Sequence, residues 1–307
     1  MMGGAVDPHD PHAAASTVQS RTSDWLMRYG KWLIIGPPML YLLVFFLIPF
    51  AFALKISFAD TAVRVPPFTD ILTIGPDWHI HLTLEIYGVS YLYSIRTAFF
   101  STLVCLALGY PMAYAIARSS KATQSILLLI IILPFWTSFL LRVYALEGII
   151  RETGLLNSAL LWLGIIHKPL QIMHTTLAVY LGIIYSYLPF MVLPLFATLE
   201  KLDHSLNEAA ADLGSPPWRT FLDVTLPLSM PGIIAGSMLV FIPAVGEFVI
   251  PTLLGGPDNL MIGRVLWDEF FGNRDWPVAS AVAVAFLILL VGPIALYQHY
   301  STKQLEA

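Results

Sequence analysis

Charged side chains are scarce in this chain. Of its 307 residues, Asp, Glu, Lys and Arg make up only 12%, whereas apolar residues make up 57%. A soluble domain carries about 25% charged residues, because they cover the surface that faces water. The composition therefore excludes an ordinary soluble domain and predicts a membrane protein that crosses the bilayer several times. The net charge of −4 also argues against a nucleic-acid partner, because nucleic acids attract basic surfaces.

The sequence also lacks several signatures of enzymes and cofactor sites. Its single cysteine, Cys105, lies in an apolar run, which excludes an intramolecular disulfide and a thiolate metal cluster. No GxxxxGKS or GxxxxGKT segment is present, so the chain has no P-loop for a nucleotide, and no cofactor is expected. HExxH and GxSxG are absent too, so nothing indicates a zinc hydrolase or a serine esterase. His9 and His12 stand without further ligands, so no metal site is predicted.

Long apolar runs are abundant by contrast. About 20 residues, rising about 1.5 Å each, cross a hydrocarbon core of about 30 Å as a helix. The third run is short unless Arg142 snorkels to the interface, and prolines recur within several runs, which neighbouring helices can accommodate. The fold expected is all-α, with six predicted spans at residues 32–54, 97–117, 125–141, 175–199, 232–254 and 278–297.

The first span has 31 residues before it. Although Ala51-Phe52-Ala53 loosely resembles a cleavage site, an apolar run of 23 residues is too long for a signal peptide. We therefore expect a retained helix, following a leader (residues 1–30) whose composition is typical of disorder. A membrane domain would then cover residues 31–300, with a short tail at 301–307.

Lys and Arg are distributed unevenly between the loops. They concentrate in the segments that share a side with the N-terminus, which is the cytoplasmic side by the positive-inside rule. The chain is therefore expected in the inner membrane of the cell. Both termini and the loop 200–231 are expected on the cytoplasmic side. The predicted cytoplasmic residues are Arg21, Arg28, Lys31, Arg118, Lys121, Lys201, Arg219 and Lys303.

The loop 200–231 contains two short helical patterns. Ser205 to Glu208 fits a capping box that starts the first helix, and Gly214 is typical of its left-handed stop. Ser215-Pro216 is expected to start the second helix, with the serine as cap and the proline at the first position. Leu226-Pro227 is expected to close it.

The acidic face of this loop indicates what it contacts. A helix that lies on lipid favours Lys and Arg on its polar face, whereas the first helix here carries Glu208 and Asp212. Its consecutive alanines leave the backbone open to a close approach. A docking helix for another protein is therefore the preferred interpretation.

The same loop resembles a known signature. It resembles the EAA motif of ATP-binding-cassette (ABC) importer permeases. The matching positions are Glu208-Ala209-Ala210, then Gly214 after three residues, Val224 after nine more, and Leu226-Pro227 after one more. The one departure is Val224, where the family often has isoleucine. The resemblance implies the type I importer permease fold, and it implies that this loop is a coupling helix held in a groove of a separate ATPase.

A second stretch narrows the resemblance. Residues 246–257 (GEFVIPTLLGGP), 261–267 (MIGRVLW) and 273–280 (NRDWPVAS) are similar to those of polyamine-importer permeases, most of all the larger permease of the putrescine-type system. The resemblance covers residues 30–300. It implies a second, related permease, two copies of an ATPase that binds the ATP, and an extracytoplasmic binding protein that delivers putrescine or spermidine.

Glu247 is the acidic residue expected inside the membrane. A carboxylate there costs several kcal/mol unless it is paired or hydrated. Two alternatives remain open. Glu247 lies on the path of a cationic substrate, or it is structural and pairs with Arg142 or a backbone amide.

Aromatic residues are the other candidates for a cation path. The predicted members are Tyr180, Tyr187, Trp136 and Phe248, because a ring face attracts a cation by about 0.5–2 kcal/mol. The alternative is plain packing, which is the commoner role of an aromatic stripe.

An outer loop carries the predicted docking residues for the binding protein. They are Arg264, Asp268, Glu269, Arg274 and Asp275. A solvated charged face is the alternative, since exposed charge clusters are common.

The function expected is therefore that of a transporter subunit and not of an enzyme. The alternatives are an ABC permease for another small solute, a secondary transporter driven by an ion gradient, and a membrane enzyme that uses Glu247 as a base. The docking helix argues against the ion-driven carrier, which has no ATPase. The enzyme would need further catalytic groups in the membrane, and the sequence offers no such constellation.

Overall fold

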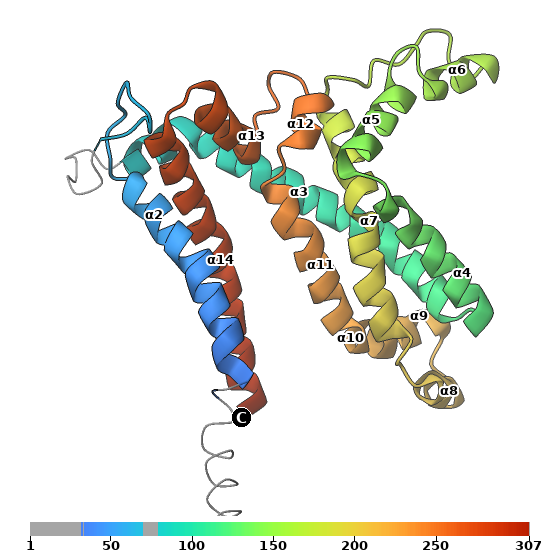
Figure 1. Ribbon diagram of the computed structural model, residues 1–307. Helices are drawn as coiled ribbons and strands as arrows, with labels where there is room; N and C mark the ends of the chain where they lie inside the picture. Colours follow the sequence, from blue (N-terminus) through green and yellow to red (C-terminus); the bar gives the residue numbers. More distant parts are fainter. Residues whose placement is uncertain (1–31, 33, 70–78, 307) are drawn as a thin grey trace, which may run out of the picture. The chain divides into compact units, whose positions relative to one another are not determined.

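The computed structural model describes residues 32, 34–69 and 79–306, and these residues are mostly helical (Figure 1). The chain divides into two units, residues 1–56 and 57–307. In the described part of the first unit, Ile34–Ile56 form one helix of 23 residues. It contains a π-helical turn at Leu43–Leu47 and ends with α2 (Ile48–Ile56), neither of which buries a residue. The predicted leader lies outside the described residues.

Three long helices form the core of the second unit: α3 (His79–Ala117), α7 (Thr176–Leu199) and α11 (Met230–Val245). Each packs against the other two, and α3 crosses the other two (Figure 1). The side chains of Ile183, Met191, Leu195 and Val240 are fully buried between them. Within residues 57–69 and 79–306 the only β-structure is one isolated bridge between Thr61 and Phe68.

A glycine pair brings α11 against the backbone of α7. Gly232 and Gly236 are four residues apart, the spacing at which small residues let membrane helices approach closely. A Cβ at Gly236 would lie 3.0 Å from the carbonyl oxygen of Met191, and one at Gly232 would lie 2.6 Å from Oγ1 of Thr198. The two backbones therefore touch with no side chain between them.

The buried face of α3 is small and polar. Ser94, Thr97, Ser101 and Cys105 recur every three or four residues, and all four are completely buried. The thiol of Cys105 donates to the carbonyl of Ile184 at 3.8 Å. Such residues let helices pack closely in a medium where the hydrophobic effect does not drive association.

The third predicted span contains a sharp break. α4 (Lys121–Ile132) continues into a 3-10 turn (Leu133–Trp136), and α5 (Phe139–Ile150) then leaves at 97° and is followed by α6 (Leu155–Trp162). The hydroxyl of Thr137 donates to the carbonyl of Pro134 at 2.7 Å, a local bond that competes with helix continuation. The predicted span at residues 125–141 therefore contains a bend that hydropathy alone does not indicate.

The fifth predicted span is also interrupted. α11 ends at Val245, and α12 (Val249–Leu253) resumes after Gly246, Glu247 and Phe248. On its other side, α9 (Pro217–Thr220), a π-helical turn (Phe221–Thr225) and α10 (Leu226–Leu228) lead into α11 through a bend of 65°. The remaining helices are α8 (His204–Asp212), α13 (Ile262–Trp267), a π-helical turn (Asp268–Gly272, here η4) and α14 (Trp276–Glu306).

Several of these helices suit a bilayer. Among the described residues, Ile34–Ile56, Glu85–Ala117 and Thr176–Leu199 are long and apolar enough to cross it, and counting each bent pair as one span gives five. Trp276–Val291 is a shorter apolar helix. The predicted span 175–199 coincides with α7. Within the second unit, α8 lies at one end of the helices and α12 and α13 lie at the other (Figure 1).

Candidate functional site

The helix α8 begins one residue before the predicted capping box. Its N-cap is Asp203, whose carboxylate accepts the N–H of Ser205 at 2.9 Å. Ser205 therefore lies inside the helix, and the capping box with Glu208 is a wrong prediction. The physical reason is that aspartate caps as well as serine does and adds a negative charge at the positive end of the helix dipole.

Gly214 ends α8 as predicted. Its φ is +82°, a conformation that costs glycine nothing because it has no Cβ. The N–H of Ser215 then reaches the carbonyl of Ala210 at 3.0 Å. The next helix begins at Pro217, with Pro216 as N-cap, so the predicted start at Ser215-Pro216 is one residue too early.

The end of this second helical segment also differs from the prediction. Leu226 and Pro227 were expected to close it, but both lie within α10, and the chain bends only at Ser229. Proline is tolerated at the first positions of a helix, where its missing N–H has no intrahelical acceptor.

The EAA motif lies on an open surface. Glu208, Ala209 and Gly214 are exposed, and Ala210 is half-buried. Two large apolar residues flank the motif and are exposed as well, Leu213 by 89% and Trp218 by 60%. Apolar groups gathered at one exposed site are typical of a contact surface for a partner.

Hydrogen bonds and aromatic packing tie this surface to the core. Oδ1 of Asn207 in α8 accepts the hydroxyl of Thr225 at 3.2 Å. Phe221 packs edge-on against Tyr110 of α3, with ring centroids 5.5 Å apart. The hydroxyls of Tyr110 and Ser229 lie 2.9 Å apart and are buried. These contacts connect the α8 loop to α3 and to the residue that precedes α11.

Glu247 lies in the break between α11 and α12. Its side chain is buried, with 6% exposed. Oε1 accepts the N–H groups of Phe248, Val249 and Ile250 at 3.1, 2.9 and 3.3 Å, and Oε2 accepts the hydroxyl of Tyr187. The carboxylate thus caps α12 and links it to α7.

Arg142 is bound by rings instead of by Glu247. Its guanidinium lies over Phe135 and Phe139, 4.7 and 5.5 Å from their centroids. No carboxylate of the described residues lies within 4.0 Å of this guanidinium. Of the two structural partners considered for Glu247, the structure therefore shows backbone amides and not Arg142.

The predicted aromatic residues divide into two groups. Tyr187 contacts Glu247, and Phe248 stacks on Trp267 at 4.7 Å and 10°. Trp136 is 77% exposed and Tyr180 is half-buried, and neither is brought to Glu247. Phe139 lies 6.5 Å from the ring of Tyr187 instead.

Two glycines hold α12 in place. A Cβ at Gly182 of α7 would lie 2.6 Å from Cγ2 of Ile250, and one at Gly263 of α13 would lie 2.1 Å from the carbonyl oxygen of Gly246. Neither residue is among the predicted site residues. The sequence could have indicated them, because both glycines lie inside apolar stretches expected to be helical, where glycine is disfavoured.

The predicted docking residues lie along α13, η4 and the start of α14. Asp268 is exposed, and its Oδ2 lies 3.8 Å from Nε of Arg264. Glu269 accepts the hydroxyl of Tyr87 at 2.5 Å and the amide of Asn273 at 3.0 Å.

The two remaining docking residues, Arg274 and Asp275, precede α14, and only Arg274 lines a hollow. Asp275 accepts the hydroxyl of Thr61 at 2.9 Å and caps α14 through the N–H of Val278 at 3.2 Å. Arg274 is exposed, with a φ of +56°. Together with Arg64 it lines a hollow of about 540 Å³. Glu269 and Asp275 therefore shape the surface, while Asp268 and Arg274 are open to a partner.

Comparison with known proteins identifies the chain. Residues 13–302 match the family "Binding-protein-dependent transport system inner membrane component". The chain belongs to this family. It is accordingly a multi-pass transport component of the inner membrane and not an enzyme.

Curated relatives and a solved structure agree with this assignment. Over 214 residues the permease is 44% identical to the spermidine/putrescine transport system permease protein PotB of Escherichia coli strain K12, covering 70% of this chain and 78% of PotB. PotB of Haemophilus influenzae is 37% identical over 265 residues, covering 86% and 91%. A bacterial alginate ABC transporter, solved in complex with a pentasaccharide-bound periplasmic protein, matches with a TM-score of 0.63 at 17% identity, covering 93% of this chain and 96% of that one. The expected ABC permease fold is thereby confirmed.

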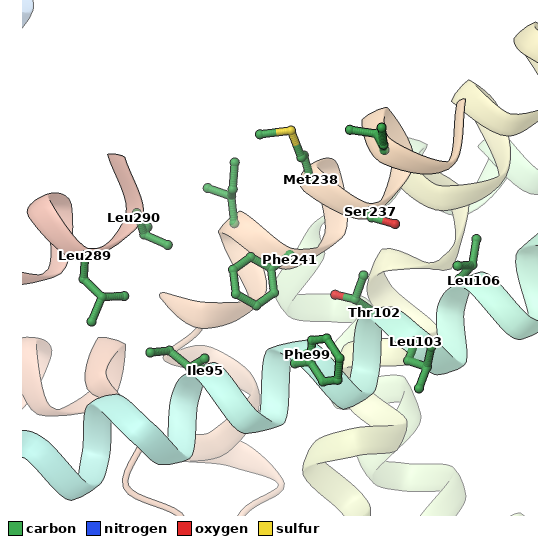
Figure 2. A pocket seen from close by; sticks show the side chains of 12 residues that line it. Ile95, Phe99, Thr102, Leu103, Leu106, Ser237, Met238, Phe241, Leu289 and Leu290 are labelled. Carbon is green, nitrogen blue, oxygen red and sulfur yellow. The ribbon is translucent and has the colours of Figure 1, made fainter. Parts of the chain in front are cut away.

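An apolar groove lies among the described helices of the permease (Figure 2). It has a volume of about 660 Å³ and runs between α3, α11 and α14, with Phe99 and Phe241 on facing helices. Thr102 and Ser237 are its only polar lining residues. Without a carboxylate it suits an acyl chain or an apolar helix and does not suit a cation. Among the described residues, no three His, Cys, Asp or Glu side chains gather as a metal site.

Proposed function

We propose that this permease is a subunit of an ATP-driven importer of polyamines, with putrescine or spermidine as substrate. The observation that carries the proposal is the 44% identity to PotB over 70% of this chain. The exposed EAA loop supports it, because a chain without a P-loop needs a partner that hydrolyses ATP. The partners are a second permease, two copies of an ABC ATPase and an extracytoplasmic polyamine-binding protein.

The EAA loop transmits the ATPase motion. Glu208, Ala209, Ala210 and Gly214 form the docked part, and the chain from there to Leu226 and Pro227 leads directly into α11. Because Asn207 is bonded to Thr225, a push on α8 moves the π-helical turn and the Ser229 bend together. On this proposal six spans cross the membrane, with α8 and both termini in the cytoplasm.

Glu247 acts at the outer gate and on the substrate path. Its carboxylate holds α12 through three amides and holds α7 through Tyr187. A substrate ammonium is a stronger donor than a phenol, because hydrogen bonds to a charged donor are about twice as strong as neutral ones. An arriving polyamine therefore displaces the Tyr187 hydroxyl and loosens the link between α12 and α7.

The outer segment receives the binding protein. Asp268 and Arg274 are exposed there, and Arg274 and Arg64 line a hollow of about 540 Å³. The alginate transporter, which shares the fold, was solved with a periplasmic protein bound. The arginines suit acidic groups on the binding protein.

The test is co-purification from the native membrane followed by uptake in proteoliposomes. The wild-type permease is expected to bring a second permease and an ATPase with it, and putrescine or spermidine on the binding protein should stimulate ATP hydrolysis and uptake. Glu208→Arg should lose the ATPase and keep the second permease. Glu152→Arg, which reverses an exposed acid outside the loop, is the matched control and should keep both.

The opposite outcome is equally definite. A permease that purifies alone and still moves polyamine along an ion gradient would be a secondary transporter. A complex that is stimulated by another solute and not by a polyamine would be an ABC permease of different specificity. Either result overturns the proposal.

A further inference from the structure

A continuous series of aromatic rings leads from the loop before α3 to the neighbour of Glu247. Adjacent ring centroids are separated by 4.3 to 6.1 Å. Phe270 stacks on Trp276 at 5.0 Å and 4°, and Phe248 stacks on Trp267 at 4.7 Å and 10°. In order, the six rings are those of Phe68, Trp276, Phe270, Phe271, Trp267 and Phe248.

Two rings of this series are open to the surroundings. Trp267 is 43% exposed and Phe271 is 58% exposed, with their centroids 4.3 Å apart. The other four rings are buried or half-buried, and their stacking fixes the positions of the two open ones. Large rings that are held rigidly and left exposed are typical of a contact surface.

Two carboxylates adjoin the Trp267 end of the open pair, one next to it in the chain and one next to its stacking partner. Asp268 follows Trp267 in the chain and has a side chain that is 56% exposed. Glu247 precedes Phe248, on which Trp267 stacks. Nε of Arg264 lies 3.8 Å from Oδ2 of Asp268, so it weakens the attraction of the site for cations without blocking it.

We propose that Trp267 and Phe271, together with Asp268, form an outer binding site for a linear polyammonium ion on its way to Glu247. This site rests on the proposed function. Ring faces attract ammonium groups, the exposed carboxylate adds its charge, and the methylene chain between amino groups packs against the rings. Amino groups separated by three or four methylenes lie about 5–6 Å apart in an extended chain, which is comparable to the separation of adjacent rings.

The test changes the ring electrons of Trp267 without changing its size. Mono-, di- and trifluorinated tryptophan are placed at position 267, because fluorine withdraws charge from the ring face. The reconstituted complex is then assayed for spermidine uptake at saturating loaded binding protein. Uptake should fall in graded steps, to about one half to one fifth of wild type with the trifluorinated ring. Basal ATP hydrolysis should not change.

Controls separate this site from general packing. The same fluorinated series at Trp162, which is 85% exposed on α6 and outside the ring series, should leave uptake unchanged. Asp268→Asn should lower uptake by a similar factor. If fluorination at position 267 leaves the uptake rate unchanged while Trp267→Leu abolishes uptake, the ring contributes through packing alone and the site is refuted. If the wild-type complex transports no polyamine, the proposed function and this site fall together.

Discussion

Gly263→Ala is the substitution for which the structure gives the most definite expectation. The new Cβ would lie 2.1 Å from the carbonyl oxygen of Gly246 and 2.9 Å from that of Glu247. An ordinary contact of this type begins near 3.4 Å, so the two backbones must separate by about 1.3 Å. Both sides of the contact are main chain, so no side chain can rotate away.

The energetic cost follows from this geometry. Overpacking of a buried contact costs about 1–3 kcal/mol, and a backbone-to-backbone contact belongs near the upper limit. Alanine recovers up to about 1 kcal/mol through its better helix propensity. A net loss of about 2 kcal/mol remains. It lowers the Tm of a 307-residue chain by about 3 °C, because the entropy of unfolding is about 2.1 cal/mol/K per residue. Uptake should fall as well, because the displaced residues include Glu247.

The assay is thermal unfolding of the purified complex in detergent, followed by uptake in proteoliposomes. Gly272→Ala is the control, since a Cβ there has no atom within 4 Å, and it should melt like wild type. Equal melting temperatures for the Gly263 and Gly272 variants would refute the claim that α13 rests directly on the Gly246–Glu247 turn.

Three further predictions concern the coupling loop, the gate and the helix core. Asn207→Ala removes the hydrogen bond from the hydroxyl of Thr225 at 3.2 Å, which is worth about 1 kcal/mol. The ATPase should still co-purify, but fewer substrate molecules should be transported per ATP hydrolysed. An unchanged ratio of substrate to ATP would contradict the coupling route. Tyr187→Phe removes the hydroxyl bonded to Glu247 and leaves the three amides in place, so the complex should fold normally and take up polyamine at an altered rate; uptake identical to wild type would remove the hydroxyl from the gate. Gly236→Ala places a Cβ 3.0 Å from a carbonyl oxygen of α7 and should lower the Tm by about 1.5 °C per kcal/mol lost. An unchanged Tm would contradict the close helix contact.

The sequence predicts the helical fold well because hydropathy is a local property. The apolar run at residues 175–199 matches Thr176–Leu199 almost residue for residue. The breaks are harder to predict. Those at Thr137 and at Gly246–Phe248 depend on side chains that bond nearby carbonyls and amides, and a hydropathy window averages such single residues away.

The candidate site shows the same division. The EAA loop and its stop at Gly214 follow from spacing and from the conformational freedom of glycine. The role of Glu247 as the cap of α12, by contrast, needs three amides at 2.9 to 3.3 Å, which appear only once the chain turns. The cap at Asp203 was ambiguous in sequence, because aspartate and serine compete for the same function within three residues.

The contact of Gly232 and Gly236 with α7 has a mechanical consequence. Helices whose backbones interlock without intervening side chains cannot slide past each other or pivot independently, so α7 and α11 form one lever. α12 is seated on the same lever through Gly182. On the proposed function, a stroke that reaches α11 therefore moves the α8 end and the Glu247 end of this lever together. The two sharp bends of the second unit, at Thr137–Ser138 and at Ser229, lie outside this lever.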